Sequence, residues 1–372
     1  MKIVVTGGHL IPALAVIEQL AKLAPKTQFY FFGRRQAVEG DAADSFEFLE
    51  ISNLGIPFFE IPAGRIQRRI TKYTLLSLFK IFPGLLKSVM LLTRIKPDVI
   101  LTFGGYVAIP VALAAILARI PVIAHEQTPK LGLANKIIFK FAKLKGIADV
   151  ALFKKIGNNK SVFTGPLLRE EIFNTKPKSA NLREFLAKVD QGKLIYITGG
   201  AVGSSFLNNL VATVIDKILK FAFVIHQTGN LTKSADFSRL SQLKAKLPKN
   251  LQDKYLPSEF VGAADAGAVF LRANLIICRS GANTTAELAA LGKVAIVVPL
   301  EWGSEQKKIA ANLAKTGAVI VLRGVITGNT LLKAITTIFK KYEEFTQAST
   351  NLKNQTKLDG AQVFAQKILK IT

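Results

Sequence analysis

The sequence predicts an α/β protein made of two doubly wound parallel-sheet domains, and three observations support this fold class. Short β-rich runs alternate with helical periods along the whole chain. A strand followed by Thr-Gly-Gly and a helix occurs at Thr6 and again at Thr198. A strand, a glycine turn and a helix also occur twice, at Gly104-Gly105 and at Gly281. In such folds the ligand binds at the carboxyl ends of the strands, so we expect it in a cleft between the domains.

The predicted strands are short runs of β-branched and aromatic residues, each followed by a Gly, Pro or polar turn. Most of these turns lead into a helical period, as in Pro12–Leu23 and Asn283–Leu291. In chain order the strands are Lys2–Val5, Gln28–Phe32, Val99–Thr102, Val122–Ala124, Leu194–Thr198, Phe223–His226, Leu275–Cys278 and Ala295–Val298.

The domain boundary is expected near the polar, Pro-containing stretch Asn174–Asn181. We therefore assign residues 1–168 to an N-terminal domain and residues 169–354 to a C-terminal domain. A final helix over about 355–372 has no strand after it; it could close either domain, and we place it back on the first.

The composition allows a large core and restricts the possible partners. The chain has 372 residues, of which 49% are hydrophobic, and its single cysteine, Cys278, excludes an intrachain disulfide. The net charge of +25 attracts polyanions such as nucleic acid, an anionic membrane face or a phosphorylated substrate. Gly7-Gly8-His9 interrupts the first apolar run, which argues against a signal peptide. The apolar run Tyr106–Ala118 is too short to span a bilayer, so we expect a soluble or peripheral cytoplasmic-side protein.

The glycine turns are candidate anion sites. A glycine pair between a strand and a helix lets backbone N–H groups approach an anion, and the helix N-terminus adds its dipole. Tight β-α turns also use glycine for purely structural reasons. Because four such turns fall on equivalent strand ends, we favour diphosphate binding.

All three histidines lie beside these motifs. His9 follows the first glycine pair, and it is either a structural hydrogen-bonding residue or a base acting near neutral pH. His125 stands in "AHEQTPKLGLANK" and His226 in "IHQTG". We expect His226, at a strand end, to be structural.

The segment "RSGANTTAEL" combines a turn glycine with small polar residues that open a helix. Its Ser, Thr and Asn residues could be simple N-caps. Alternatively, the first-turn N–H groups and the Thr284 and Thr285 hydroxyls hold a diphosphate, and Glu287 accepts hydrogen bonds from a ribose diol. Glu287 in the first helical turn would also suit the helix dipole without any ligand.

The segment 65–96 has eight Lys or Arg residues, no Asp or Glu, and many interleaved Leu and Phe residues. It is either an ordinary amphipathic helix pair broken at Pro83 or a patch that binds an anionic membrane surface. The sequence lacks a Walker lysine loop, HExxH, CxxC and an Asp-x-Asp pair, so we expect a reaction with no metal and no cofactor.

Taken together, these motifs resemble the MurG family of GT-B glycosyltransferases. The matching segments, in family order, are "TGGHLIPALAV", "PDVILTFGGYVAIPVALAA", "IPVIAHEQTPKLGLANK", "TGPLLR", "YITGGAVGSSFLN", "IHQTG" and "CRSGANTTAELAALGK" with "PLEWGSEQ". The resemblance implies inverting transfer of N-acetylglucosamine from UDP-N-acetylglucosamine to undecaprenyl-diphospho-N-acetylmuramoyl-pentapeptide, the lipid I to lipid II step of peptidoglycan synthesis. It also implies a peripheral position on the cytoplasmic face of the cell membrane.

The resemblance assigns roles to individual residues. It makes His9 and Glu126 the catalytic residues, with His9 on the acceptor side, either near the lipid diphosphate or acting as the base. Those on the acceptor side are Thr6, Gly7, Gly8, Gly104, Gly105, Tyr106, Thr128 and Asn135. The donor-binding residues are Arg169, Ala201, Val261, Arg279, Gly281, Ala282, Asn283, Thr284, Thr285, Glu287 and Gln306. Among these, Arg169 would contact the diphosphate, the Val261 backbone the uracil, and Gln306 the transferred sugar.

The chain departs from the family pattern at several of these motifs. The first glycine loop is shorter, and Thr128 stands where the family has asparagine. Ala201 and Val202 replace a serine and a glutamine, and Ile309 replaces an asparagine beyond Gln306. These departures leave open a different UDP-sugar transferase acting on a glycolipid, or a non-catalytic UDP-sugar-binding relative. A specific nucleic-acid binder is disfavoured because the sequence shows no aromatic stacking platform or basic recognition helix.

Overall fold

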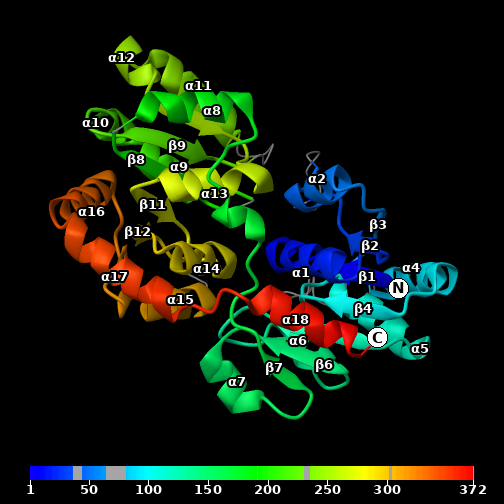
Figure 1. The fold of residues 1–372 in the computed structure, drawn as a ribbon. Helices are drawn as coiled ribbons and strands as arrows, with labels where there is room; N and C mark the ends of the chain where they lie inside the picture. The colour runs from blue at the N-terminus through cyan, green and yellow to red at the C-terminus, as the bar shows by residue number, and fades with distance from the viewer. Residues whose placement is uncertain are drawn as a thin grey trace. The chain divides into compact units, whose positions relative to one another are not determined.

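The computed structural model describes residues 1–36, 44–63, 81–190, 192–200, 202–229, 235–300 and 304–371. The chain divides into two compact units (Figure 1). Unit 1 comprises Met1–Glu39, Asp44–Arg169 and Lys357–Thr372, and unit 2 comprises Glu170–Thr356.

Unit 1 contains a parallel sheet of seven strands in the order β3-β2-β1-β4-β5-β6-β7 among its described residues. Its elements are β1 Lys2–Thr6, α1 Leu10–Leu23, β2 Gln28–Gly33, α2 Phe46–Asn53, β3 Phe58–Glu60, α4 Ile81–Ile95, β4 Val99–Thr102, α5 Ala108–Leu117, β5 Val122–Glu126, α6 Leu133–Ile138, β6 Leu144–Ile147, α7 Val150–Ile156, β7 Ser161–Phe163 and α18 Gly360–Leu369. The last helix, α18, returns to unit 1 and packs beside α1 (Figure 1).

Unit 2 contains a parallel sheet of six described strands in the order β10-β9-β8-β11-β12-β13. Its elements are η1 Glu170–Phe173, α8 Ala180–Val189, β8 Leu194–Thr198, α9 Ser205–Ala212, α10 Ile215–Leu219, β9 Phe223–Gln227, α11 Asp236–Lys246, α12 Lys249–Gln252, β10 Tyr255–Ser258, α13 Ala263–Arg272, β11 Leu275–Cys278, α14 Ala282–Leu291, β12 Ala295–Val297, α15 Ser304–Ala314, β13 Val319–Val321, α16 Gly328–Lys340 and α17 Tyr342–Gln355.

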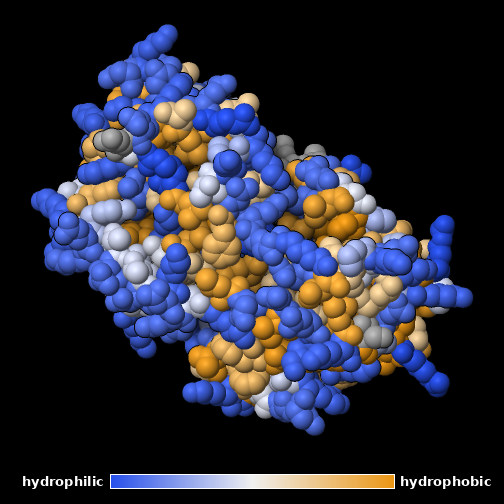
Figure 2. Space-filling view, in the orientation of Figure 1, coloured by the Kyte–Doolittle hydropathy of each residue, from blue (hydrophilic) through white to orange (hydrophobic). Residues whose placement is uncertain are grey.

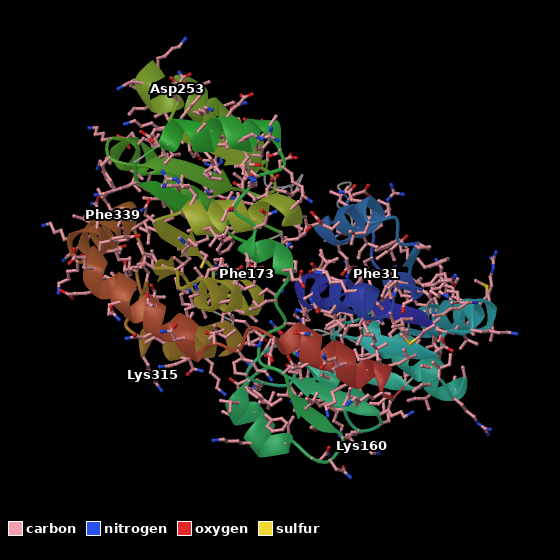
Figure 3. The ribbon with its side chains drawn as sticks, in the orientation of Figure 1. Phe31, Lys160, Phe173, Asp253, Lys315 and Phe339 are labelled. Atoms are coloured by element: carbon pink, nitrogen blue, oxygen red, sulfur yellow. The ribbon has the colours of Figure 1, made fainter. Side chains whose placement is uncertain are left out.

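Each sheet is buried on both faces, which explains why the central strands read as continuous apolar runs. Successive residues of a strand point to opposite faces, so Val4 joins one core of unit 1 while Ile3 and Val5 join the other. Phe31, which is labelled in Figure 3, belongs to the second of these cores. Its ring stacks on Phe58 with 5.7 Å between the ring centroids. Phe364 of α18 packs into the same core.

The predicted fold class of two doubly wound parallel-sheet halves is confirmed. All eight predicted strands are present, with ends that agree to within two residues. Five strands were not predicted: β3, β6, β7, β10 and β13. Four of these five lie at the edges of the two sheets.

The strand order locates the expected binding edge in each unit. In unit 1 the order of the strands reverses between β1 and β4, and in unit 2 it reverses between β8 and β11. Ligands of open α/β sheets bind beyond the carboxyl ends of the strands at such a reversal. The glycine motifs predicted from the sequence follow these four strands.

Candidate functional site

The first two glycine turns of unit 1 touch each other through their backbones. A Cβ on Gly8 would lie 2.7 Å from the Gly104 carbonyl oxygen, and one on Gly105 would lie 2.9 Å from the Gly8 Cα. All three residues also have positive φ angles, from 84° to 123°. Only glycine allows this approach without strain, so the close contact of the β1–α1 and β4–α5 turns requires glycine at these positions.

The N–H groups of the first turn are already bound within unit 1. Gly7 N donates to the Phe32 carbonyl at 2.7 Å, and Gly8 N donates to Glu47 Oε1 at 2.9 Å. Glu47 lies on α2, and burial raises the pKa of its carboxyl group while the Gly8 and Arg34 N–H groups lower it. Binding by this turn would therefore depend on His9 and helix α1 rather than on these two amides.

Glu47 was missed by the sequence reasoning. Its carboxylate reaches a turn 39 residues earlier in the chain, and nothing in the local pattern of α2 indicates that contact. A Cβ on Gly7 would lie 2.4 Å from Glu47 Oε2, so the carboxylate and the turn fit closely. Glu47 thus holds the turn that carries His9.

His9 differs from the other histidine of unit 1 in its exposure. His9 is the N-cap residue of α1 and is partly exposed. His125 is fully buried, and its Nε2 lies 2.9 Å from Thr164 Oγ1. Burial, together with a smaller effect of the charge of nearby His9, lowers the pKa of His125 to about 3. His125 is therefore neutral at physiological pH and has a structural role in the core. His9, in contrast, lies beyond the carboxyl end of β1, where it is partly exposed.

Glu126 organises the loop that follows β5. Its Oε1 accepts from Thr128 N at 3.1 Å and lies 2.7 Å from the Thr128 hydroxyl. Its Oε2 accepts from Gly132 N at 2.9 Å and from Asn135 Nδ2 at 3.0 Å. Glu126 is only 4% exposed, so the structure gives it a clear role in holding the loop. A direct catalytic role for Glu126 stays a prediction.

Asn135 connects this loop to the glycine turns. Its Nδ2 also donates to the His125 carbonyl at 3.0 Å, and its side chain lies against Gly104. Asn135 Oδ1 is buried and has no hydrogen-bond partner among the residues that the structure describes. Buried amide oxygens are normally satisfied, so this atom fits a site that is completed by a ligand or water.

The remaining acceptor-side candidates differ in accessibility. Thr6 is fully buried and donates to Thr102 Oγ1 at 2.9 Å, so it supports the turns from below. Thr128 is 3% exposed and points into the Glu126 loop. Tyr106 is 37% exposed and stands on the same edge as Gly104 and Gly105. Among these three, Tyr106 is the one placed to meet a ligand.

In unit 2, the turn after β8 packs on the turn after β9. A Cβ on Gly203 would lie 2.1 Å from the Thr228 carbonyl oxygen, and one on Gly229 would lie 2.5 Å from the Val202 carbonyl oxygen. Gly200 N donates to Thr198 Oγ1 at 3.0 Å, as Gly104 N does to Thr102 Oγ1 in unit 1. Ala201 lies outside the described residues.

Helix α14 presents its N-terminus at the same edge. Its N-cap, Gly281, has open space around the position of a Cβ. Asn283 Oδ1 and Arg279 Nε are buried and have no hydrogen-bond partner within the described part of the chain. The Arg279 guanidinium lies 5.8 Å from the centroid of the Phe206 ring. An open helix N-terminus with the unsatisfied Arg279 Nε donor beside it fits an anionic ligand, whereas the Asn283 oxygen is an acceptor and is suited to a hydroxyl group or water.

Two details of α14 correct the sequence interpretation. Thr285 N donates to the Gly281 carbonyl at 3.0 Å, and the Thr285 hydroxyl donates to the same oxygen at 2.8 Å. Both hydrogen-bond donors of Thr285 are therefore used within the helix. The N–H groups that have no intrahelical acceptor are those of Ala282, Asn283 and Thr284. Glu287 lies in the second turn of α14, so the helix dipole does not account for it.

The other donor-side candidates come from several elements of the chain. Val261 N is 3.3 Å from Gln227 Oε1, and Gln306 Oε1 accepts from Leu300 N at 3.1 Å. Glu287 is 5% exposed. Arg169 is buried and is the last residue of unit 1. Ile309, which replaces a family asparagine, lies in the core of unit 2 and not at the edge.

The basic segment 65–96 is described from Ile81 onward, and its residues 65–80 lie outside the described ranges. Helix α4 buries Leu91 and Leu92 against α5 and exposes a stripe of Phe82, Leu86 and Met90, which are 60–70% exposed. Hydrophilic residues cover most of the visible face of the protein, with apolar areas between them (Figure 2). Helix α4 runs through Pro83 and carries apolar side chains on its outer face as well as on its buried face, so the two interpretations of this segment stay open.

Within the described ranges, no helix is both long enough and apolar enough to cross a bilayer. The same residues include no group of three or more His, Cys, Asp or Glu side chains placed to hold a metal ion.

Comparisons with known proteins identify the family. Residues 3–146 match the N-terminal domain of glycosyltransferase family 28, and residues 194–364 match its C-terminal domain. The UDP-N-acetylglucosamine--N-acetylmuramyl-(pentapeptide) pyrophosphoryl-undecaprenol N-acetylglucosamine transferase of Treponema denticola is 31% identical over 86% of this chain and 82% of the relative. The transferase of the same name from Borrelia hermsii is 28% identical over 98% of this chain and 94% of the relative.

Solved structures agree with this result. The crystal structure of Acinetobacter baumannii MurG covers all of both chains with a TM-score of 0.66 and 26% identity. UDP-GlcNAc 2-epimerase from Neisseria meningitidis, bound to UDP-GlcNAc, has a TM-score of 0.67 at 15% identity, which shows the shared fold. The family resemblance seen in the motifs is confirmed, and the chain belongs to glycosyltransferase family 28, as one of its MurG-type N-acetylglucosamine transferases.

Proposed function

We propose that this protein transfers N-acetylglucosamine from UDP-N-acetylglucosamine to undecaprenyl-diphospho-N-acetylmuramoyl-pentapeptide, with inversion at the anomeric carbon. The observation that carries the proposal is the family match over both units, because the relatives bear the name of this activity. The open edge of unit 2 at α14 supports it independently.

The donor is assigned to unit 2. The N–H groups of Ala282, Asn283 and Thr284 and the Arg279 guanidinium bind the diphosphate, where they stabilise the charge that builds on UDP as it leaves. Glu287 accepts from the ribose hydroxyls, the Val261 backbone contacts the uracil, and Gln306 contacts the sugar. Arg169 contacts the diphosphate, as the family resemblance implies.

The acceptor is assigned to unit 1. His9 takes the proton from the acceptor hydroxyl, and that oxygen attacks the anomeric carbon from the face opposite UDP. Tyr106 and the turn at Gly104–Gly105 contact the acceptor, while Glu126, Asn135 and Glu47 hold the loops in place. The reaction uses no metal ion, since helix N-termini and arginine carry the leaving-group charge.

The protein acts at the cytoplasmic face of the cell membrane, where the lipid-linked acceptor is found. The exposed stripe Phe82, Leu86 and Met90 of α4, a helix that also carries Lys87 and Arg94, supports this placement. Apolar side chains flanked by cations are suited to an anionic leaflet, at about 1 kcal/mol per nearby charge.

The experiment that tests the proposal measures UDP release with both substrates. We expect release that requires UDP-N-acetylglucosamine together with the lipid-linked muramoyl-pentapeptide, and a product in which one N-acetylglucosamine has been added. Transfer to another glycolipid would favour the alternative hypothesis that the protein is a different UDP-sugar transferase. Tight UDP-sugar binding without transfer to either acceptor would contradict catalysis.

A further inference from the structure

Gln227 lies between two loops that the proposed function assigns to the donor. It is the last residue of β9 and is 7% exposed. Its Nε2 donates to the Gly200 carbonyl at 3.0 Å, in the turn after β8. Its Oε1 accepts from Val261 N at 3.3 Å, in the loop after β10, and from Tyr196 Oη at 2.8 Å. One side-chain amide therefore links the turn after β8 to the loop after β10.

The chemistry of these contacts requires an amide. The Gly200 carbonyl needs a donor, whereas Val261 N–H and the Tyr196 hydroxyl need an acceptor, and only an amide supplies both at this length. A glutamate would lose the donor, and a methionine would lose both functions while keeping a similar size. The three hydrogen bonds thus restrict position 227 to an amide side chain, whereas packing alone would also accept an apolar side chain of similar size.

The neighbouring residue, His226, holds the opposite face of the sheet. Side chains alternate along a strand, and His226 bonds to Asn208 Oδ1 and Tyr255 Oη, each at 3.0 Å. Asn208 Nδ2 in turn donates to the Thr228 carbonyl at 2.9 Å. The His226 contacts do not involve Gly200 or Val261, so a change at Gln227 leaves this second set of bonds in place.

We propose that Gln227 is a positioning residue for the UDP-sugar donor. It fixes the Gly199-Gly200 turn and the Val261 backbone relative to each other. Both loops are then held in their binding positions before the diphosphate and the uracil of the donor arrive. Preorganisation of this kind lowers the entropy that binding must overcome. The inference rests on the proposed function and adds a residue to its donor site.

The test compares donor and acceptor kinetics of Gln227→Met. We expect the KM for UDP-N-acetylglucosamine and the Kd for UDP to rise about tenfold, as the loss of one or two net hydrogen bonds predicts. We expect the acceptor KM and kcat at saturating donor to stay within about twofold, because the loops are displaced rather than the reacting groups. Tyr196→Phe removes only one of the three bonds and should give a smaller rise in the donor KM.

The matched control is Gln252→Met. Gln252 on α12 also donates to backbone carbonyls, those of Leu247 at 2.8 Å and Ala245 at 3.2 Å, but it precedes the amino end of β10. Its loss should lower the melting temperature without changing the donor KM. A melting temperature measured for each variant separates lost stability from lost positioning.

The possible outcomes separate the two proposals. If wild-type protein binds no UDP-sugar, the proposed function fails and takes this inference with it. If wild type binds and Gln227→Met binds equally well, only the role of Gln227 is overturned. An equal rise in donor and acceptor KM would also overturn it. If Gln227→Met does not fold, an unchanged donor KM in Tyr196→Phe and Gln227→Glu decides against the proposal.

Discussion

Histidines that look alike in the sequence have different surroundings in the structure. His125 and His226 are fully buried, and burial lowers the pKa of each to about 3. His9 is partly exposed at the edge where the turns of unit 1 meet. Proton transfer to a ligand needs a side chain that the ligand can reach, so His9 is the histidine of unit 1 suited to act as a base.

Replacing His9 by alanine should affect turnover much more than donor binding. We expect kcat to fall at least about a hundredfold, the usual contribution of a general base. The Kd for UDP should stay within about twofold, because the donor residues that we assign, Arg169 apart, belong to unit 2. Steady-state kinetics and calorimetric titration with UDP measure the two effects. Near-normal turnover would dismiss His9 as the base.

The buried state of His226 predicts how stability depends on pH. The pKa of His226 is about 3 in the folded protein against an ordinary 6.5, with Asp236 raising it and Arg239 lowering it. Between these values the unfolded chain binds the proton, so the free energy of unfolding falls as the pH decreases below 6.5. The slope from this residue is at most about 1.4 kcal/mol per pH unit.

A variant without this titration should respond less to acid. Urea unfolding of His226→Gln at several pH values between about 7 and 5 should show a lower stability than wild type at neutral pH and a shallower decline on acidification. An identical decline in both proteins would mean that His226 is not a neutral buried group.

At the scale of single elements, helix α14 offers a substitution that separates binding from folding. Gly281 has φ −72° and ψ 142°, which any residue adopts, and a Cβ there would meet no atom of the described residues within 4 Å. Gly281→Ala should therefore keep the melting temperature or raise it slightly. If the donor diphosphate occupies the space at this N-terminus, the added methyl group should raise the donor KM about tenfold or more. Unchanged donor kinetics would place the diphosphate elsewhere.

The elements also show what the sequence can predict and what it cannot. Central strands are buried on both faces and form apolar runs, so all eight predicted strands appear. Edge strands are short, and β10 even contains Pro257, which is tolerated because the strand lies at a sheet edge. Strand β6 contains Lys145 and Gly146, which weaken its β-rich pattern.

The candidate site likewise contains parts that the sequence could predict and parts that it could not. Glycine turns and the α14 segment are local patterns, so the sequence could place them on strand ends. Glu47 and Gln227 act through contacts with residues distant in the chain, which no local pattern contains. The burial of Thr128 and Ile309 could also be seen only in the folded structure. Both residues depart from the family pattern, and their burial places them away from the exposed edge.

At the scale of the whole molecule, the two units share one hydrogen-bond arrangement at a strand end. A threonine at a strand end accepts the N–H of a glycine two residues on, at Thr102–Gly104 in unit 1 and at Thr198–Gly200 in unit 2. Both pairs stand beside the reversal of strand order in their sheet. The two pairs end β4 and β8, which are not equivalent strands, so this hydrogen bond is separate from the repeated Thr-Gly-Gly pattern at Thr6 and Thr198. Both pairs nevertheless lie at the position that α/β sheets use for ligands.

The charge of the whole chain and the outer face of α4 together predict membrane binding. The net charge of +25 attracts an anionic bilayer at long range, but charge alone is weakened by salt. Phe82, Leu86 and Met90 are 60–70% exposed and can add apolar burial that salt does not screen. Replacing all three by serine should lower cosedimentation with anionic vesicles about tenfold or more at moderate salt.

The control for this triple variant is Val325→Ser, which removes an 88% exposed apolar side chain from unit 2. It should leave vesicle binding unchanged, and neither variant should alter the Kd for UDP. Because the α4 side chains are exposed, their loss should not lower the melting temperature. If the triple variant binds vesicles as wild type does at every salt concentration, α4 is not the membrane-contacting element. Attraction would then rest on charge alone and should vanish for both proteins in high salt.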